Sequence, residues 1–175
     1  ALRGAGGVRC WGSNMYGELG SGALMDGYPH PVSVVNSVGN SGTMNGGVMI
    51  SSGLNSNCFV NSIGRIRCWG YNFDGQLGDG TYTNAASPVL VIGFGGDDGN
   101  QAGVVVSQGG HHACAISNYD FTDCWGNGAQ GSLGIGSATS YNRPLVVNDH
   151  YSWSIGVVAG SGSQSCCLRR SDRVP

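Results

Sequence analysis

Short apolar stretches, separated by clusters of Gly, Ser, Asn and Asp, run along the whole chain. Three of them come shortly before a Cys, at residues 48–50, 104–106 and 157–158. Stretches of this length with turn residues on both sides predict β-strands rather than helices. No apolar run approaches the roughly 18 residues that a membrane-spanning helix needs. We therefore expect an all-β fold and no membrane span.

One segment recurs three times with identical internal spacing, Cys-Trp-Gly followed by Gly-x-Leu-Gly-x-Gly. The three copies have their cores at residues 10–22, 68–80 and 124–136. Their Trp residues are 58 and then 56 residues apart, a period typical of propeller blades. The repeat predicts a single array over residues 1–175 of about three β-propeller-like blades.

Each blade is expected to hold four short antiparallel strands. Residues 58–60 and 66–69 flank a polar turn and predict a β-hairpin. After each repeat core a Pro precedes an apolar residue, at Pro31, Pro88 and Pro144, and we expect a further strand to start at each Pro.

The repeat residues themselves predict how blades pack. The Gly residues supply positive φ for two sharp turns, and each Leu is expected to lie between blades as an apolar plug. Each Trp is most simply explained by core or inter-blade packing. The third copy departs from the pattern, because Gly128 stands where the others have Asn14 and Asn72, so we expect a local difference there. The structural repeat residues are Trp11, Leu19, Trp69, Leu77, Trp125 and Leu133.

The pattern Cys-Trp-Gly-x-Asn-x-x-Gly-x-Leu-Gly-x-Gly resembles the regulator of chromosome condensation repeat, and the resemblance covers nearly the whole chain. It implies a propeller. It also implies that His111 and His112, just before Cys114, include a His that stabilises a turn. The family's namesake activity is guanine-nucleotide exchange with chromatin binding, which would need a complete ring, a reducing compartment and a basic tail.

The predicted ring is incomplete in this chain alone, because propellers close with about four to eight blades. Cys10 has no partner ten residues upstream and Cys166 has none at position 176, so the array starts and ends within a blade. The missing halves are complementary. Three explanations remain open: a piece of a longer protein, a chain completed by further subunits, or a self-closed unit.

The Cys spacing predicts disulfides. Cys58 and Cys68 are ten residues apart, as are Cys114 and Cys124, and a hairpin of that span brings its ends to disulfide distance. Each bridge is expected to contribute about 2–3 kcal/mol. The alternative is reduced, buried Cys residues.

The other three Cys residues complete an unusually high count of seven. Cys10 and Cys166 are disulfide candidates if the chain ends meet, which would leave Cys167 free or intermolecular. The count favours an oxidising compartment, extracellular or an organelle lumen.

Net charge and the lack of known motifs argue against several classes of function. The formal net charge is −2 and only 10% of residues are charged, so we expect no nucleic-acid partner; the small cluster of Arg169, Arg170 and Arg173 reads as a solvated end or a continuing strand. No phosphate loop, dinucleotide fingerprint or nucleophile elbow occurs, so we assign no catalytic residue, cofactor or metal. Residues 97–100 are interpreted as a solvated turn rather than a calcium loop.

We therefore predict a non-catalytic protein–protein interaction or structural scaffold module, partnered by a protein or by further subunits that complete the propeller. Rigid blades would present variable loops at residues 23–30, 82–87 and 137–142. Glycan or small-ligand binding stays open as an alternative, because the loops carry one Tyr each. The partner-binding candidates are Tyr28, Tyr82 and Tyr141.

Overall fold

The structure is a computed structural model that describes residues 7–37, 40–94, 101–148 and 154–169. Residues 97–100, Arg170 and Arg173 lie outside this part of the chain. The elements are β1 (Arg9–Gly12), β2 (Tyr28–Ser33), β3 (Val35–Ser37), β4 (Asn40–Thr43), β5 (Gly47–Ser52), β6 (Ser56–Asn61), β7 (Ile66–Gly70), β8 (Ala85–Leu90), β9 (Gly103–Gln108), β10 (His112–Ser117), β11 (Thr122–Gly126), the 3₁₀ turn η1 (Ala129–Gly131), β12 (Tyr141–Val146), β13 (Ser154–Ala159) and β14 (Ser165–Arg169). No α-helix occurs in the described ranges.

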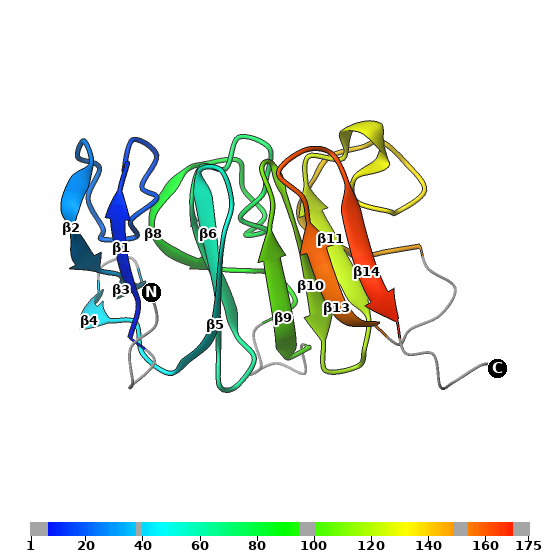
Figure 1. Cartoon of the computed structure of the whole chain (residues 1–175), viewed down its shortest axis with the longest axis horizontal. Coiled ribbons are helices and arrows are strands. Elements are labelled where there is room, and N and C mark those ends of the chain that lie inside the picture. The colour runs from blue at the N-terminus through cyan, green and yellow to red at the C-terminus, as the bar shows by residue number, and fades with distance from the viewer. Residues whose placement is uncertain (1–6, 38–39, 95–100, 149–153, 170–175) are drawn as a thin grey trace.

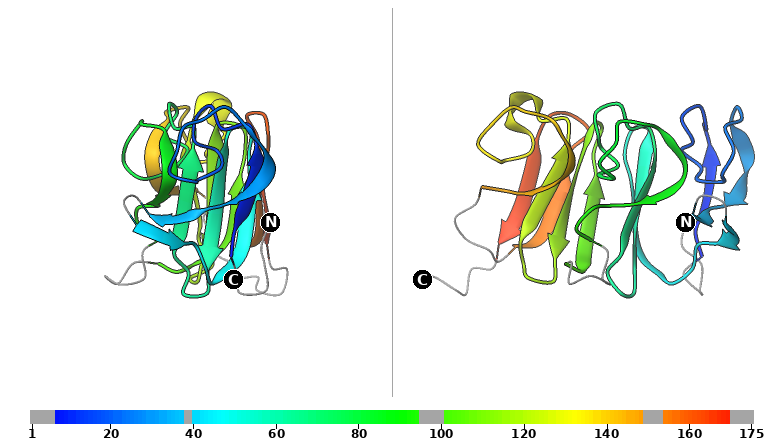
Figure 2. Two further views of the ribbon diagram at one scale, coloured as in Figure 1. Left: turned by 90° about the vertical axis from the view of Figure 1, so that its left-hand side faces the viewer. Right: turned by 180° about the vertical axis from the view of Figure 1, so that it is seen from behind.

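Two blades are complete. Their antiparallel sheets have the orders β5-β6-β7-β8 and β9-β10-β11-β12, so each blade is a four-stranded meander. A two-stranded sheet, β1-β2, lies at one end of the row, and another, β13-β14, lies at the other end (Figures 1 and 2). The prediction of an open array of four-stranded antiparallel blades is confirmed.

The outer strands begin earlier than the sequence predicts. Pro31, Pro88 and Pro144 lie inside β2, β8 and β12 rather than at their first residues, so that expectation is wrong. These are the outermost strands of their sheets, where a residue without an N–H removes no ladder bond from the interior. The small β3-β4 hairpin between β2 and β5 has no counterpart among the described residues of the other repeats, and the sequence does not predict it.

The Trp of each complete blade packs on the repeat before it. Trp69 is fully buried, and its indole Nε1 donates to the backbone oxygen of Glu18 at 2.8 Å. A Cβ built on Gly20 would lie 2.9 Å from this indole, so a larger residue would displace the ring. Trp125 repeats the contact with the backbone oxygen of Gln76 at 2.9 Å. These contacts join successive blades.

Trp11 differs from its two counterparts. It is 54% exposed, whereas Trp69 and Trp125 are 0% exposed. The prediction that all three Trp residues are packed is therefore wrong for Trp11 in the described part of the chain. The Leu residues of all three repeats, at 19, 77 and 133, are buried.

An Asn side chain braces the turn after the Trp in two of the repeats. The Oδ1 atoms of Asn14 and Asn72 accept the backbone N–H of the Leu five residues later, at 3.0 and 2.9 Å. In the third repeat, which has Gly128 instead, the loop forms η1, and the Ser132 hydroxyl donates to the Asn127 carbonyl at 2.6 Å. The expected local difference is present.

Two disulfides cross the central hairpins. Cys58 is bonded to Cys68 and Cys114 to Cys124, each with Cα atoms 4.1 Å apart, and each pair stands directly opposite in the strand register. These are the two pairs that the ten-residue spacing predicts.

The remaining thiols, Cys10, Cys166 and Cys167, are free. Cys10 lies on β1 and Cys166 on β14, at opposite ends of the row (Figure 1). β1 and β14 lie apart, so the bond between Cys10 and Cys166 does not form within this structure.

Candidate protein-binding face

The loops gather at one end of the blades, which we call the upper face (the upper edge in Figure 1). It consists of the connections at residues 13–27, 53–55, 71–84, 109–111, 127–140 and 160–164. The opposite end carries the tight hairpin turns at residues 61–65 and 117–121. Each predicted variable loop, at residues 23–30, 82–87 and 137–142, starts in an upper-face connection and runs into the strand that follows it, β2, β8 or β12.

Charge is distributed unevenly between the two ends. The upper-face loops contain Glu18, Asp26, Asp74 and Asp79 but no Arg. The Arg residues of the described chain lie on strands or in a lower turn, at positions 9, 65, 67, 143 and 169. An acidic face repels the phosphate backbone of a nucleic acid. Nor does any helix of the described ranges have the length and hydropathy needed to cross a membrane.

An aromatic row crosses the upper face from blade to blade. The Tyr16 and Tyr71 rings meet edge to face with centroids 5.0 Å apart, and Tyr71 lies 5.1 Å from Phe73 and 6.2 Å from the His111 ring. Tyr16 follows β1, Tyr71 follows β7, and His111 precedes β10. Three successive repeats therefore contribute to one continuous surface.

Polar contacts fix one end of this row. The Asp74 carboxylate contacts the His111 Nδ1 at 2.9 Å and accepts the Asn127 amide N–H at 2.9 Å. Both partners belong to the next blade, so the carboxylate is held from two sides across the blade boundary. Loss of hydration raises the pKa of the Tyr71 phenol, and the nearby Asp74 carboxylate and Tyr16 hydroxyl raise it further. Tyr71 is neutral near pH 7.

The two adjacent His residues have different roles. His111 is exposed and bridges two blades, while His112 is buried with its Nε2 2.8 Å from the Ser165 hydroxyl. Burial lowers the pKa of His112, the neighbouring His111 lowers it further, and a backbone hydrogen bond to Gln164 opposes them. The Ser165 hydroxyl donates in turn to the Ser132 carbonyl at 2.9 Å. The contact between His112 and Ser165 is therefore a structural one, which joins β10 to β14.

The candidate tyrosines do not form a common row. Tyr28 and Tyr141 occupy equivalent places at the start of the fourth strand, but the middle blade has Ala85 there, and Tyr82 lies three residues earlier in the loop. Tyr82 is half exposed, whereas Tyr141 packs against a core cluster. The recurrence that suggested a glycan site is therefore not present in space.

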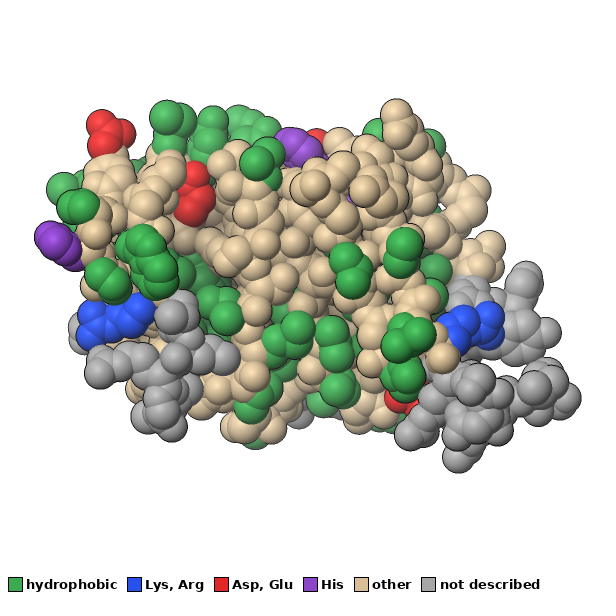
Figure 3. Space-filling model, viewed as in Figure 1, with side chains coloured by type: hydrophobic (Ala, Val, Ile, Leu, Met, Phe, Trp, Pro, Cys, Tyr) green, Lys and Arg blue, Asp and Glu red, His purple; other side chains and the backbone are tan. Residues whose placement is uncertain are grey.

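Further large apolar side chains are exposed on the upper-face loops. Besides Phe73, these are Met15, Leu24, Met25, Leu54 and Tyr82, all at least 50% exposed. Figure 3 shows hydrophobic side chains along the left and middle of the upper edge, and exposed apolar side chains gathered on one face mark interaction sites. Sequence reasoning missed Met15 and Phe73, although both stand four residues after a repeat Trp, where the frame is constant and the side chain varies.

No group of three or more His, Cys, Asp or Glu residues that could hold a metal ion occurs in the described ranges.

Two family models of the regulator of chromosome condensation (RCC1) repeat match the chain, at residues 50–76 and 64–116. The chain contains RCC1 repeats. The ultraviolet-B receptor UVR8 of Arabidopsis thaliana is 33% identical over 144 residues, which make up 82% of this chain and 30% of UVR8. The human E3 ubiquitin-protein ligase HERC2 is 27% identical over 167 residues, 94% of this chain and 3% of HERC2.

Solved structures of RCC1-repeat proteins share the fold. Human WBSCR16 superimposes with a TM-score of 0.79 at 24% identity, and Prp20p of Saccharomyces cerevisiae with a TM-score of 0.75 at 18% identity. Each match covers 98% of this chain and 42% of the other chain. The chain thus spans less than half the length of these relatives.

Proposed function

We propose that this chain is a non-catalytic protein–protein interaction module that binds its partner through the upper face. The observation that carries the proposal is the aromatic row of Tyr16, Tyr71, Phe73 and His111, which three successive repeats build. Aromatic and Met side chains are enriched at protein interfaces. The cross-blade contacts of Asp74 hold the row in place before binding, which lowers the entropy that association loses.

The acidic and apolar side chains of the upper-face loops indicate which kinds of residue a partner should present. The upper-face loops carry four acidic residues and no Arg, so complementary charge on the partner is basic. The exposed Met15 and Phe73 would pack against apolar side chains of the partner that lie between its basic residues. Protein binding has precedent for this fold, because yeast Prp20p binds Gsp1p, histones and Kap60.

A display library of random linear peptides tests this function. We expect the chain to select peptides that combine Arg or Lys with aromatic or aliphatic residues, and Tyr71→Ser with Phe73→Ser to weaken the binding of the selected peptides at least tenfold. Ile63→Ser is the matched control, because Ile63 is 56% exposed in a lower hairpin turn, and it should leave binding unchanged. Selection of no binders, or equal binding by both variants, would overturn the proposal.

We also propose that the chain folds in an oxidising compartment. The two cross-strand disulfides support this, because such bonds persist where thiols are not kept reduced. Mass spectrometry of thiols alkylated at the moment of cell lysis should find Cys58, Cys68, Cys114 and Cys124 protected. Full alkylation of these four residues would contradict the proposal.

A further inference from the structure

A carboxylate fixes the His111 ring at the boundary between the two complete blades. His111 precedes β10, and its Nδ1 lies 2.9 Å from the Oδ2 of Asp74, which belongs to the loop after β7. The Asp74 Oδ1 accepts the Asn127 amide N–H at 2.9 Å, and the Asp74 backbone N–H donates to the Oε1 of the fully buried Gln76 at 3.1 Å. These contacts hold the carboxylate, and the carboxylate in turn holds the imidazole.

The same contact decides which nitrogen of the neutral His111 ring carries the hydrogen. A neutral imidazole has one N–H donor and one acceptor nitrogen, whereas a carboxylate only accepts. The hydrogen is therefore on Nδ1, where Asp74 accepts it. The His111 side chain is 47% exposed, so Nε2 is the acceptor that this ring offers to a partner at the upper face.

The ionisable groups that adjoin His111 differ in charge near pH 7. Asp74 contacts the ring from the loop after β7, Tyr71 lies beside it in the same loop, and His112 is the next residue in the chain. Loss of hydration raises the pKa of Tyr71, and burial lowers the pKa of His112. Tyr71 and His112 are therefore uncharged near pH 7, and Asp74 carries the negative charge.

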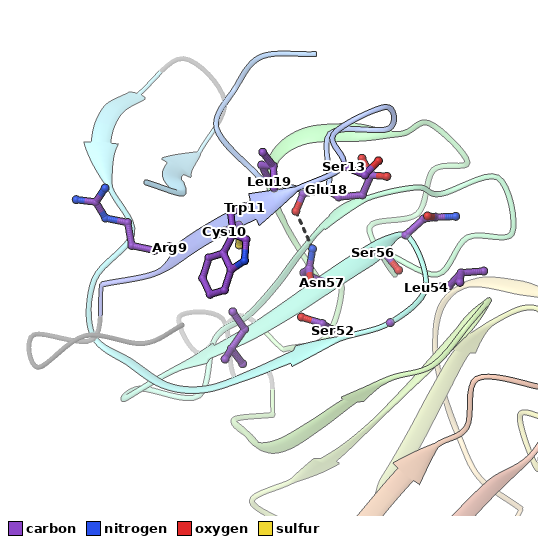
Figure 4. Close-up of a pocket in the computed structure, with 13 residues that line it drawn as sticks. Arg9, Cys10, Trp11, Ser13, Glu18, Leu19, Ser52, Leu54, Ser56 and Asn57 are labelled. Atoms are coloured by element: carbon purple, nitrogen blue, oxygen red, sulfur yellow. Dashed lines mark hydrogen bonds between the residues drawn. The ribbon is translucent and has the colours of Figure 1, made fainter. Parts of the chain in front are cut away.

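Two other acidic groups of the upper-face loops are held within their own repeats. The Glu18 carboxylate accepts the Tyr16 backbone N–H at 2.8 Å, and the Glu18 backbone oxygen accepts the Asn57 amide N–H at 2.7 Å (Figure 4). The Asp79 carboxylate accepts the Thr81 backbone N–H at 3.0 Å and its hydroxyl at 2.9 Å. Because these loops contain no Arg, their negative potential attracts a cationic donor to the aromatic row.

We propose that the His111 Nε2 accepts an N–H from a Lys or Arg side chain of the partner, and that a proton on His111 releases the partner. The inference rests on the proposed function, because it assigns one contact within that binding face. The negative potential of the loops favours a cationic donor over a hydroxyl. The Asp74 contact holds the acceptor in place before the partner arrives, which lowers the entropy that association loses.

Acidification reverses this recognition. A protonated imidazole has an N–H on both nitrogens, so Nε2 no longer accepts, and the ring presents a positive charge to the cation of the partner. Like charges placed together at an interface oppose binding. Histidine ordinarily changes its charge between about pH 8 and about pH 5. Binding is therefore strong at pH 7.5 and weakens as the pH falls.

Fluorescence anisotropy with the tightest-binding basic peptide from the display library tests the release. We expect the dissociation constant to rise about tenfold from pH 7.5 to pH 5.5. His111→Gln, which cannot gain a proton, should bind more weakly at pH 7.5 and show a rise of about twofold or less. His30→Gln is the matched control, because His30 is exposed on β2 outside the upper-face loops, and it should keep the wild-type pH dependence.

The outcomes separate this inference from the proposed function. Equal dissociation constants of the wild type at the two pH values, or an undiminished pH dependence in His111→Gln, would overturn the inference and leave the proposed function standing. A library that yields no binder at pH 7.5 would overturn both. Titration of Asp123, whose pKa burial raises to about 6, is common to all three proteins and cancels in the comparison.

A double-mutant cycle identifies the side chain of the partner that meets His111. Each Lys or Arg of the peptide is replaced by Gln in turn, and each peptide is measured against the wild type and His111→Gln at pH 7.5. One replacement should weaken binding to the wild type about tenfold but binding to the variant about twofold or less. Additive effects at every basic position would refute the contact.

Nuclear magnetic resonance tests the acceptor without a partner. Long-range ¹H–¹⁵N spectra of the free chain at pH 7.5 should show the His111 hydrogen on Nδ1, and Asp74→Asn should lower the fraction of that tautomer. A wild-type ring that carries its hydrogen on Nε2 would also overturn the inference, because its outer nitrogen would then be a donor.

Discussion

Asp123 is a buried carboxyl group whose replacement by Asn should stabilise the protein at neutral pH. It lies on β11 with 3% of its surface exposed, and its Oδ2 has no hydrogen-bond partner among the described residues. Burial raises the pKa of this group from its ordinary value of 3.8 to about 6, although a hydrogen bond with Gln101 acts in the opposite direction. That difference corresponds to about 3 kcal/mol.

The direction of the pH effect on stability follows from which state, folded or unfolded, binds the Asp123 proton more tightly. The folded chain holds the Asp123 proton up to about pH 6, while the unfolded chain releases it near pH 4. The free energy of unfolding therefore falls as the pH rises from about 4 to about 6, and the loss is complete above that window. An Asn side chain of the same shape is neutral throughout and escapes this loss.

Urea unfolding, followed by Trp fluorescence at pH 3.5 and pH 7.5, measures the effect. We expect wild type and Asp123→Asn to differ little at pH 3.5, and the variant to be about 1–3 kcal/mol more stable at pH 7.5. Titration of His112 is common to both proteins and cancels in the difference. Asp120→Asn, in the adjoining lower turn, is the matched control for the loss of one carboxylate in this part of the chain. A variant that is equally or less stable at pH 7.5 would refute the reasoning.

Further predictions concern stability and are measured by the same urea unfolding at a concentration where the chain is monomeric. Trp69→Ala should lower the free energy of unfolding by about 3–5 kcal/mol, because Trp69 is fully buried, whereas Trp11→Ala should change it by about 0.5 kcal/mol or less; equal losses would contradict the blade packing. The pair Cys58→Ser and Cys68→Ser should cost about 2–3 kcal/mol, and added reductant should destabilise the wild type more than this double variant, which keeps only the Cys114–Cys124 bond. Asn72→Ala should lower the free energy of unfolding by about 2 kcal/mol, because the buried Leu77 backbone N–H, which donates to Asn72 Oδ1, would then have no acceptor. An unchanged free energy of unfolding would show that the turn does not need this hydrogen bond.

The repeat made the fold predictable from the sequence. Constant spacing between Cys, Trp and Gly placed the central hairpins, and a separation of ten residues was enough to pair Cys58 with Cys68, because a hairpin is a local structure. The position of each outer strand was less accurate. The sequence predicts a strand start at Pro31, but Pro31 lies within β2, because an outermost strand tolerates a missing N–H.

Contacts between blades were harder to predict. Tyr71 and His111 are 40 residues apart in the sequence, and they meet only because two blades stack. The exposed Trp11 has the same sequence context as the buried Trp69, and its environment depends on which strands lie beside it. Tyr28 and Tyr82 stand in equivalent loops of the sequence, but the different loop lengths place them at different positions in the strand register. Such differences are set by packing rather than by local sequence.

Hydrogen–deuterium exchange of the wild-type chain, with and without a peptide selected from the display library, tests the central claim most directly. The account predicts that the peptide slows exchange at residues 70–76 and 109–112 on the upper face and leaves the lower turns at residues 61–65 and 117–121 unchanged. Protection confined to the lower turns would contradict it.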